Sequence, residues 1–300
     1  MAQGDRATIG VVDIATPNVT IGGLTDLPFP PGVQEVVEGS AGVDAEYLAI
    51  MAAMGRVAFT TRDLTALASI GLNGVAVTTL DAYYQMLAGV SGREAYGSAK
   101  HLKVSMSSGL AVPRMLSCGV GETAQCSFEA FAISADGATN PITVTADQTM
   151  PDDGSVDDVW TIGPIELNTV DYDVGSVSID FGLDVAQEPP TEGDTYPKLC
   201  LIANRRPRIT LTTLSAEAMA TITSAGLALT SFAVYFRKLA ARGTRVAEVT
   251  AEHVKISGTT GMAIPGDSSA SIGGGRLATP ITIVPDTSPP LTISTASAIT

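Results

Sequence analysis

The chain has 300 residues, of which 45% are hydrophobic and 16% are charged, and its formal net charge is −14. The apolar fraction is sufficient for a buried core and excludes a disordered polymer. The acidic balance argues against a protein that grips the nucleic-acid backbone, because such proteins need clustered Lys and Arg. The low charge content fits a surface covered by partners, and fits an ordinary globular protein rich in Ala, Gly and Thr equally well.

Three features favour a protein that matures in a cytoplasm. The stretch Met1 to Gly10 has no apolar core after a basic start, so no secretory signal is expected. The longest apolar stretch, Leu227 to Phe236, is far shorter than the roughly 20 residues that span a bilayer, so no membrane segment is expected. The cysteines Cys118, Cys126 and Cys200 form no CxxC motif, which favours reduced thiols over a disulfide between Cys118 and Cys126.

The N-terminal part is predicted to begin with an arm. Residues 1–43 are short apolar runs broken by Gly and Pro, which is typical of an extended arm rather than a core element. Residues 44–54 are predicted to form a short helix with its apolar side chains on one face, namely Tyr47, Leu48, Met51 and Met54.

The clearest predicted helix covers residues 62–70. Thr61 precedes it as the expected N-cap, and Asp63 in the first turn favours the helix dipole. Gly71 is a natural stop, and Asn73-Gly74 turns the chain into a strand over residues 75–79.

Strand patterns dominate from residue 100 onward. Alternation is clearest at Cys126, Phe128, Ala130 and Ala132, and again over residues 176–185. In the second stretch Val177, Ile179, Phe181, Leu183 and Val185 are predicted to face one way, with Asp180 and Asp184 on the opposite face. Further strands are expected at residues 102–106, 142–145, 208–214 and 227–239, while 247–256 is ambiguous between strand and helix.

The C-terminal part, about 272–300, contains two short strands separated by a proline break and is predicted to be an arm or an edge hairpin. We see no internal repeat and no linker, so the sequence predicts one domain over residues 1–300 with an N-terminal and a C-terminal arm.

The sequence lacks the local motifs of common catalytic sites. It has no GxSxG, P-loop or GxGxxG pattern, and its two histidines, His101 and His253, are isolated. With one tryptophan, Trp160, it also lacks the aromatic platforms of a carbohydrate site. The acidic stretch Asp152 to Asp158 could hold calcium, but its spacing is not that of an EF-hand, and a solvated acidic turn is the favoured interpretation. We therefore predict no catalytic residue, no metal site and no cofactor.

Acidic and basic residues are segregated along the chain. Residues 147–194 contain thirteen acidic residues and no Lys or Arg, whereas residues 198–255 contain nine basic and three acidic ones. Two interpretations stay open. The two segments could pair inside the fold, where surface ion pairs contribute little. Alternatively they could lie on opposite faces of a subunit, so that identical copies stack head to tail.

Several stretches resemble the major tail tube proteins of long-tailed, siphovirus-like bacteriophages. None of them is a sharp motif, but together they touch most of the chain. They are residues 59–64 (FTTRDL), 109–114 (GLAVPR), 160–164 (WTIGP), 177–182 (VSIDFG), 196–197 (YP), 279–283 (TPITI) and 291–296 (LTISTA).

This resemblance implies a mainly β protein with a β-sandwich or barrel tail-tube fold, one short flanking α-helix and extended arms. It implies a virion protein of the tail, assembled in the host cytoplasm, whose six copies form a ring. The rings stack into a tube that conducts DNA without binding it specifically. Its further partners are tail terminator and tail-tip proteins, and the arms, residues 1–30 and 285–300, are expected between rings. The length of 300 residues exceeds that of many such subunits and implies an additional element.

The candidates for the lumen of such a tube are Asp180 and Asp184, with Asp171 and Asp173 as further candidates. Two other classes remain as alternatives. One is another virion protein, such as a capsid or decoration subunit, and the other is a secreted β-rich adhesin or binding module.

Overall fold

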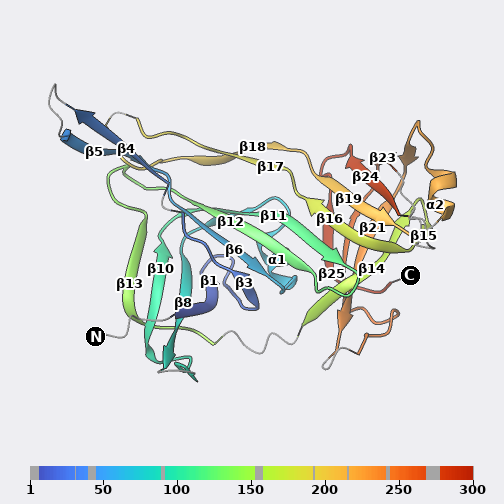
Figure 1. Ribbon diagram of the computed structural model, residues 1–300, viewed down its shortest axis with the longest axis horizontal. Helices are drawn as coiled ribbons and strands as arrows, with labels where there is room; N and C mark the ends of the chain where they lie inside the picture. The colour runs from blue at the N-terminus through green and yellow to red at the C-terminus, as the bar shows by residue number, and fades with distance from the viewer. Residues whose placement is uncertain are drawn as a thin grey trace.

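A computed structural model describes residues 7–30, 32–39, 45–88, 92–152, 158–191, 193–214, 216–240, 244–267 and 278–299. The fold is mainly β, as the sequence predicts, with antiparallel sheets and two six-residue helices (Figure 1). Among the described residues the strands form no closed barrel.

The chain consists of two halves with the same order of elements, apart from β9, which has no counterpart among the described residues of the second half. Module 1 contains β1 (Ala7–Ile14), β2 (Val19–Ile21), β3 (Leu24–Asp26), β4 (Val33–Gly39), β5 (Ala45–Ala53), β6 (Arg56–Thr61), α1 (Thr65–Ile70), β7 (Val75–Val77), β8 (Leu80–Ala88), β9 (Gly92–Arg93), β10 (Ala99–Met106), β11 (Gly109–Gly119), β12 (Gln125–Ala132) and β13 (Ile142–Thr149). Module 2 contains β14 (Val159–Leu167), β15 (Val170–Tyr172), β16 (Val174–Asp180), β17 (Leu183–Gln187), β18 (Cys200–Arg205), β19 (Arg208–Thr213), α2 (Ala216–Thr221), β20 (Leu227–Leu229), β21 (Phe232–Leu239), β22 (His253–Gly258), β23 (Gly261–Pro265), β24 (Thr279–Pro285) and β25 (Thr292–Ser297).

Strand register shows that these halves are an internal duplication. Gly109 pairs with Val77 on one side and with Ala132 on the other, and Gly261 pairs in the same way with Leu229 and Pro285. The sequences agree at the same places: residues 101–113 read HLKVSMSSGLAVP and residues 253–265 read HVKISGTTGMAIP. The prediction of no internal repeat is therefore wrong. Sequence similarity between the two modules is confined to separated segments, whereas their strand pairing corresponds in both the large and the small sheets.

The two modules share one large sheet. Its strand order is β20-β23-β24-β19-β16-β11-β12-β6-β3, with β7 pairing beside β11. The modules join where the second half of β11, Met115 to Gly119, pairs with β16. Each module also has a smaller sheet: β13-β10-β8-β1-β2 with β9 in module 1, and β15-β14-β21-β22-β25 in module 2. The hairpins β4–β5 and β17–β18 form separate two-stranded sheets.

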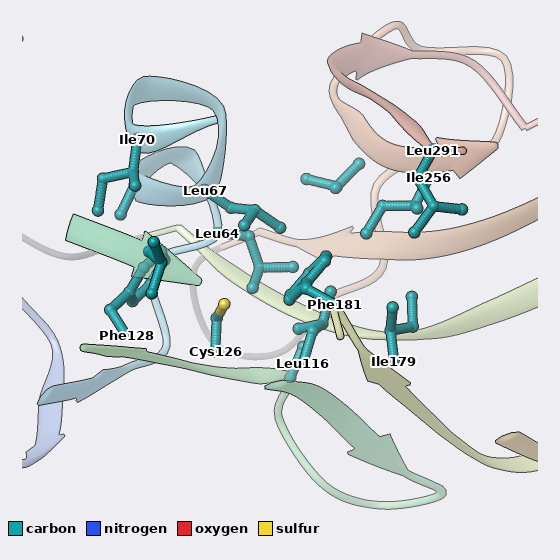
Figure 2. Close-up of a cluster of buried hydrophobic side chains, with 14 of the residues drawn as sticks. Leu64, Leu67, Ile70, Leu116, Cys126, Phe128, Ile179, Phe181, Ile256 and Leu291 are labelled. Carbon is teal, nitrogen blue, oxygen red and sulfur yellow. The ribbon is translucent and has the colours of Figure 1, made fainter. Parts of the chain in front are cut away.

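The hydrophobic core is continuous across the junction between modules. Leu64 and Leu67 lie at α1 in module 1 and belong to the same buried cluster as Phe181, Ile256 and Leu291 of module 2 (Figure 2). Because this shared core excludes water from the junction, the two modules form one packed unit.

Several sequence-based predictions were confirmed. Cys126, Phe128, Ala130 and Ala132 alternate as expected and are all buried along β12. The predicted helix 62–70 exists but begins at Thr65. Leu64 occupies the N-cap without a side-chain cap, while Thr61 Oγ1 accepts the N–H of Asp63 at 2.9 Å.

Both predicted arms require correction where they are described. Val11, Val12, Ile14 and Ile21, in β1 and β2, are fully buried, so these two strands belong to the core. At the other end, β24 lies inside the ten-stranded sheet between β23 and β19. The Gly and Pro residues that suggested arms flank core strands instead. Residues 1–6 and 268–277 lie outside the described part.

Three element predictions were wrong in type or extent. Residues 45–53 form a strand, β5, paired with β4, and not the helix predicted over 44–54. The strand predicted over 227–239 is two strands, β20 and β21, which belong to different sheets. The ambiguous stretch 247–256 contributes the start of β22, and α2 was not predicted.

Candidate functional site

One face of the ten-stranded sheet is lined by hydroxyl side chains. Alternation places the apolar residues of β16 and β19 in the core, and Ser176, Ser178, Thr210 and Thr212 on the opposite face. The registers align these residues into a row that crosses six neighbouring strands, each member exposed or half-buried: Gln125, Ser117, Ser178, Thr210, Thr282 and Ile264. We call Ser117, Ser178, Thr210 and Thr282 the hydroxyl row.

The hydroxyl row has little fixed charge. Next to it Asp180 and Arg208 are opposite each other in the β16–β19 register, and both are exposed. Neutral hydroxyls donate and accept hydrogen bonds but supply no positive potential. The four residues of the hydroxyl row carry no charge themselves, and the row can hold a layer of water.

In module 1 part of the same face is covered by the β17–β18 hairpin. Figure 1 shows this hairpin extending from module 2 across module 1. Arg114 Nη1 donates to the carbonyl of Leu183 at 2.5 Å, and Gln187 Nε2 donates to the carbonyl of Ala132 at 2.6 Å. Below the hairpin Val112 is fully buried.

An ion cluster lies at the edge of this covered area. The carboxylate of Glu129 accepts hydrogen bonds from Arg56 Nη1 at 3.0 Å and from Arg114 Nε at 2.7 Å. Both guanidinium groups lie over the ring of Phe131, with centroid distances of 5.0 and 5.1 Å. Since charge-assisted hydrogen bonds and cation–π contacts combine here, the cluster orients Arg114 toward the hairpin backbone.

The loop that follows β12 receives the far end of the hairpin. The N–H groups of Thr195 and Tyr196 both donate to the carbonyl of Gly137 at 2.9 Å. Asp136 shapes this loop because its carboxylate accepts the backbone N–H groups of Thr139 and Ala138. These hydrogen bonds, chiefly from Thr139, hold the pKa of Asp136 well below its usual range.

The equivalent area in module 2 is open. Met262 and Ile264 of β23 are 40% and 47% exposed, although their counterparts in module 1 are Leu110 and the fully buried Val112. A cleft of about 500 Å³ lies beside them, lined among others by Arg205, Arg206, Arg208, Val284, Pro285 and Pro290. Within the described residues none of these three arginines forms an ion pair.

The titratable residues of the core have structural roles. Burial raises the pKa of Cys118 and of Cys200 to about 11 and that of Cys126 well above its usual range, so the thiols are protonated at neutral pH. Both histidines are fully buried and bonded to backbone groups. In the part of the chain that the structure describes, no three His, Cys, Asp or Glu residues come together as metal ligands.

The predicted lumen residues do not lie on one element. Asp180 is at the end of β16, where its Oδ1 accepts the N–H of Gly182 at 2.8 Å. The chain turns at Gly182, whose φ is +58°, so Asp184 belongs to the β17–β18 hairpin and leaves the sheet. Asp171 lies in β15 and Asp173 directly after it; all four carboxylates are exposed. Of the acidic stretch Asp152 to Asp158, the calcium alternative, residues 153–157 lie outside the described residues, and Asp158 forms an ion pair with Lys238 at 2.9 Å.

The hydroxyl row and the open area in module 2 were not predicted. Alternating Ser and Thr in residues 176–178 and 208–214 was the available signal for the row. The open area is recognised only when equivalent residues of the two modules, identified from their strand registers, are compared for exposure.

Comparison of the chain with models of protein families found no matching family, and comparison with curated proteins found no significantly similar sequence. Neither described helix has the length and apolar character needed to cross a membrane.

Proposed function

We propose that this chain is a structural virion protein, the subunit of a phage-type tail tube, and that it acts by self-assembly without catalysis. The observation that carries the proposal is the ten-stranded sheet. It is built from two equivalent modules joined edge to edge, and one of its faces carries the hydroxyl row.

The junction between modules supports this proposal because the same strand pairing could be repeated between further modules. The β11–β16 pairing adds the second module to the first in the same strand order. Further modules added in the same way extend the sheet, and closure of the extended sheet would remove its exposed edges. A β-sandwich in each module, with a shared inner barrel in the assembly, is the tail-tube architecture that we propose.

The chemistry of the hydroxyl row supports a conduit for DNA. Hydroxyls keep the surface hydrated, and the net charge of −14 repels the phosphate backbone. Asp180 borders the row and is the strongest of the four predicted lumen candidates. We propose tail terminator and tail-tip proteins as the partners at the tube ends, and the virion tail, assembled in the host cytoplasm, as the location.

Negative-stain electron microscopy of the purified protein at high concentration tests the function. Stacked rings or hollow tubes are the expected result. A monodisperse monomer at all concentrations would overturn it and favour an adhesin or binding module. For that class, a chelator would lower the melting temperature if calcium stabilises the fold. Closed shells, or binding only to preformed particles, would instead indicate a capsid or decoration subunit.

A further inference from the structure

The internal duplication gives an intramolecular example of how one module contacts the next. At the junction β11 pairs with β16, α1 packs against module 2, and the β17–β18 hairpin lies across β11 and β12. The hairpin is the part of this junction that reaches farthest, since its loop bonds to Gly137 beyond the end of β12. Its place in the fold corresponds to that of β4–β5 in module 1.

The β4–β5 hairpin has no module beneath it in a single chain. It extends away from the body of the molecule at the upper left of Figure 1, in the direction in which β17–β18 extends over module 1. A turn of the same kind begins both hairpins. Gly32 and Gly182 have φ values of +60° and +58°, and their carbonyls accept the N–H groups of Met54 and Arg206. The two hairpins therefore leave their modules by the same local geometry.

The surface that such a hairpin would cover exists in module 2, and no hairpin among the described residues covers it. Val112, beneath the β17–β18 hairpin, is 0% exposed, whereas its counterpart Ile264 is 47% exposed. Neighbouring large apolar groups on the same face are uncommon on a surface that stays in water. Ile264 and Met262 thus differ from their counterparts in module 1 in having no hairpin over them among the described residues.

Charge favours a hairpin of this chain as the occupant. Residues 33–53 contain four acidic residues, Glu35, Glu38, Asp44 and Glu46, and no Lys, Arg or His. The cleft that borders Met262 through its register partner Val284 carries Arg205, Arg206 and Arg208, which form no ion pair among the described residues. Complementary charges of this kind orient the approach of two surfaces.

We propose that copies of this chain associate head to tail, with the β4–β5 hairpin of one copy lying across β23 and β24 of the next. Ile264 and Met262 are the apolar centre of this contact, and the arginine cleft binds the acidic hairpin. The relation is heterologous, and its repetition adds two modules per chain. This inference rests on the proposed function for one point: a ring of six modules contains three chains rather than six.

The first test uses sedimentation velocity on Ile264→Asp and on the double variant Met262→Ser/Ile264→Asp. We expect self-association to weaken by about tenfold or more, since a charge would be buried at the centre of the contact. The matched control is Val249→Asp, because Val249 is 85% exposed and lies outside the contact. Circular dichroism melts of all variants establish that they are folded. Association of Ile264→Asp equal to that of the control would overturn the proposal.

The second test uses charge reversal in both surfaces. Glu35→Arg combined with Glu38→Arg, and separately Arg205→Glu combined with Arg206→Glu, are each expected to weaken assembly. An equimolar mixture of the two variants is expected to recover mixed dimers in native mass spectrometry, because the surfaces of each variant complement those of the other. A closed ring of three chains would still contain one contact between like charges and is not expected from the mixture. If the mixture assembles no better than either variant alone, the proposed pairing of surfaces is overturned.

Ring stoichiometry separates this inference from the proposed function. Rings of three chains whose class averages show six similar lobes would support both. Rings of six chains, or rings that the Ile264 variants leave intact, would overturn the inference and leave the tube function standing. A monomer at every concentration would overturn both.

Discussion

His101 and His253 make the same pair of backbone contacts in the two modules. Nδ1 of His101 accepts the N–H of Met86 at 3.2 Å, and Nδ1 of His253 accepts the N–H of Lys238 at 3.1 Å. Nε2 of each ring faces the carbonyl six residues earlier, that of Ala95 or Ala247. Both imidazoles thus hold a loop against a strand, with Nδ1 as acceptor and Nε2 as donor.

Replacement of either histidine by leucine is expected to destabilise the protein. The change leaves one backbone N–H and one carbonyl without their partner in a buried place, at a cost of about 1–3 kcal/mol for each of these groups. Chemical denaturation of His101→Leu and His253→Leu measures this. Similar losses for the two variants are expected because the contacts are equivalent, and stability equal to wild type in either would contradict the structural role.

Glu129→Gln is expected to loosen the β17–β18 hairpin. The substitution removes the charge that holds Arg56 and Arg114, and we expect a loss of about 1–2 kcal/mol, since the arginines are partly exposed. Limited proteolysis with trypsin reports on the hairpin through Lys198 and Arg205. The matched control is Glu248→Gln, whose ion pair with Arg237 is more exposed. Equal cleavage rates in the two variants would argue against this role of Glu129.

Asp136→Asn is expected to change how stability depends on pH. Hydrogen bonds, chiefly from Thr139, depress the pKa of Asp136 in the folded state. A depressed pKa contributes stability above the unfolded value, roughly 4, and this contribution is lost as the pH falls through the folded value. The free energy of unfolding of the wild type should therefore exceed that of the variant at pH 7, and this difference should shrink below about pH 4. A difference that is constant from pH 7 to pH 2 would contradict the assignment.

The three thiols are expected to resist alkylation in the folded protein. Burial raises the pKa of Cys118 and Cys200 to about 11, so little thiolate is present at pH 8. Mass spectrometry after iodoacetamide treatment should show labelling only when denaturant is added. Cys126 has the greatest burial and should react last as denaturant is raised. Labelling of Cys126 in the native protein would contradict the buried position on β12.

The strands of the fold were more predictable than their partners. Cys126, Phe128 and Ala130 predict β12 because apolar and polar residues alternate along a half-buried strand. Ile281 and Ile283 look like part of an arm in the sequence, since Gly and Pro flank them, and only the pairing of β24 with β19 places them in the core. The prediction of a helix over 44–54 was wrong because a short apolar run fits both the helical period of 3.6 residues and the strand period of 2. Pairing with β4 makes this stretch a strand.

The candidate site was predictable only in part. Asp180 was correctly placed opposite the apolar face of its strand, but Asp184 was not followed through the turn at Gly182. The chain turns out of the sheet at this glycine, where φ is positive. Alternation along β16 therefore does not predict which way the residues after the turn face. The open area around Ile264 is recognised by comparison with Val112, which the β17–β18 hairpin covers. This contact joins distant parts of the chain, so no local pattern in the sequence predicts it.

The duplication also affects how an assembly would form. Two modules on one chain meet at an effective concentration on the order of millimolar, whatever the concentration of the protein. In the ring proposed above, half of the junctions would be made during folding, and only the other half would need a collision between molecules. A cell that makes little of this protein would still begin each ring from paired units, so nucleation would require fewer simultaneous encounters than a ring of separate modules.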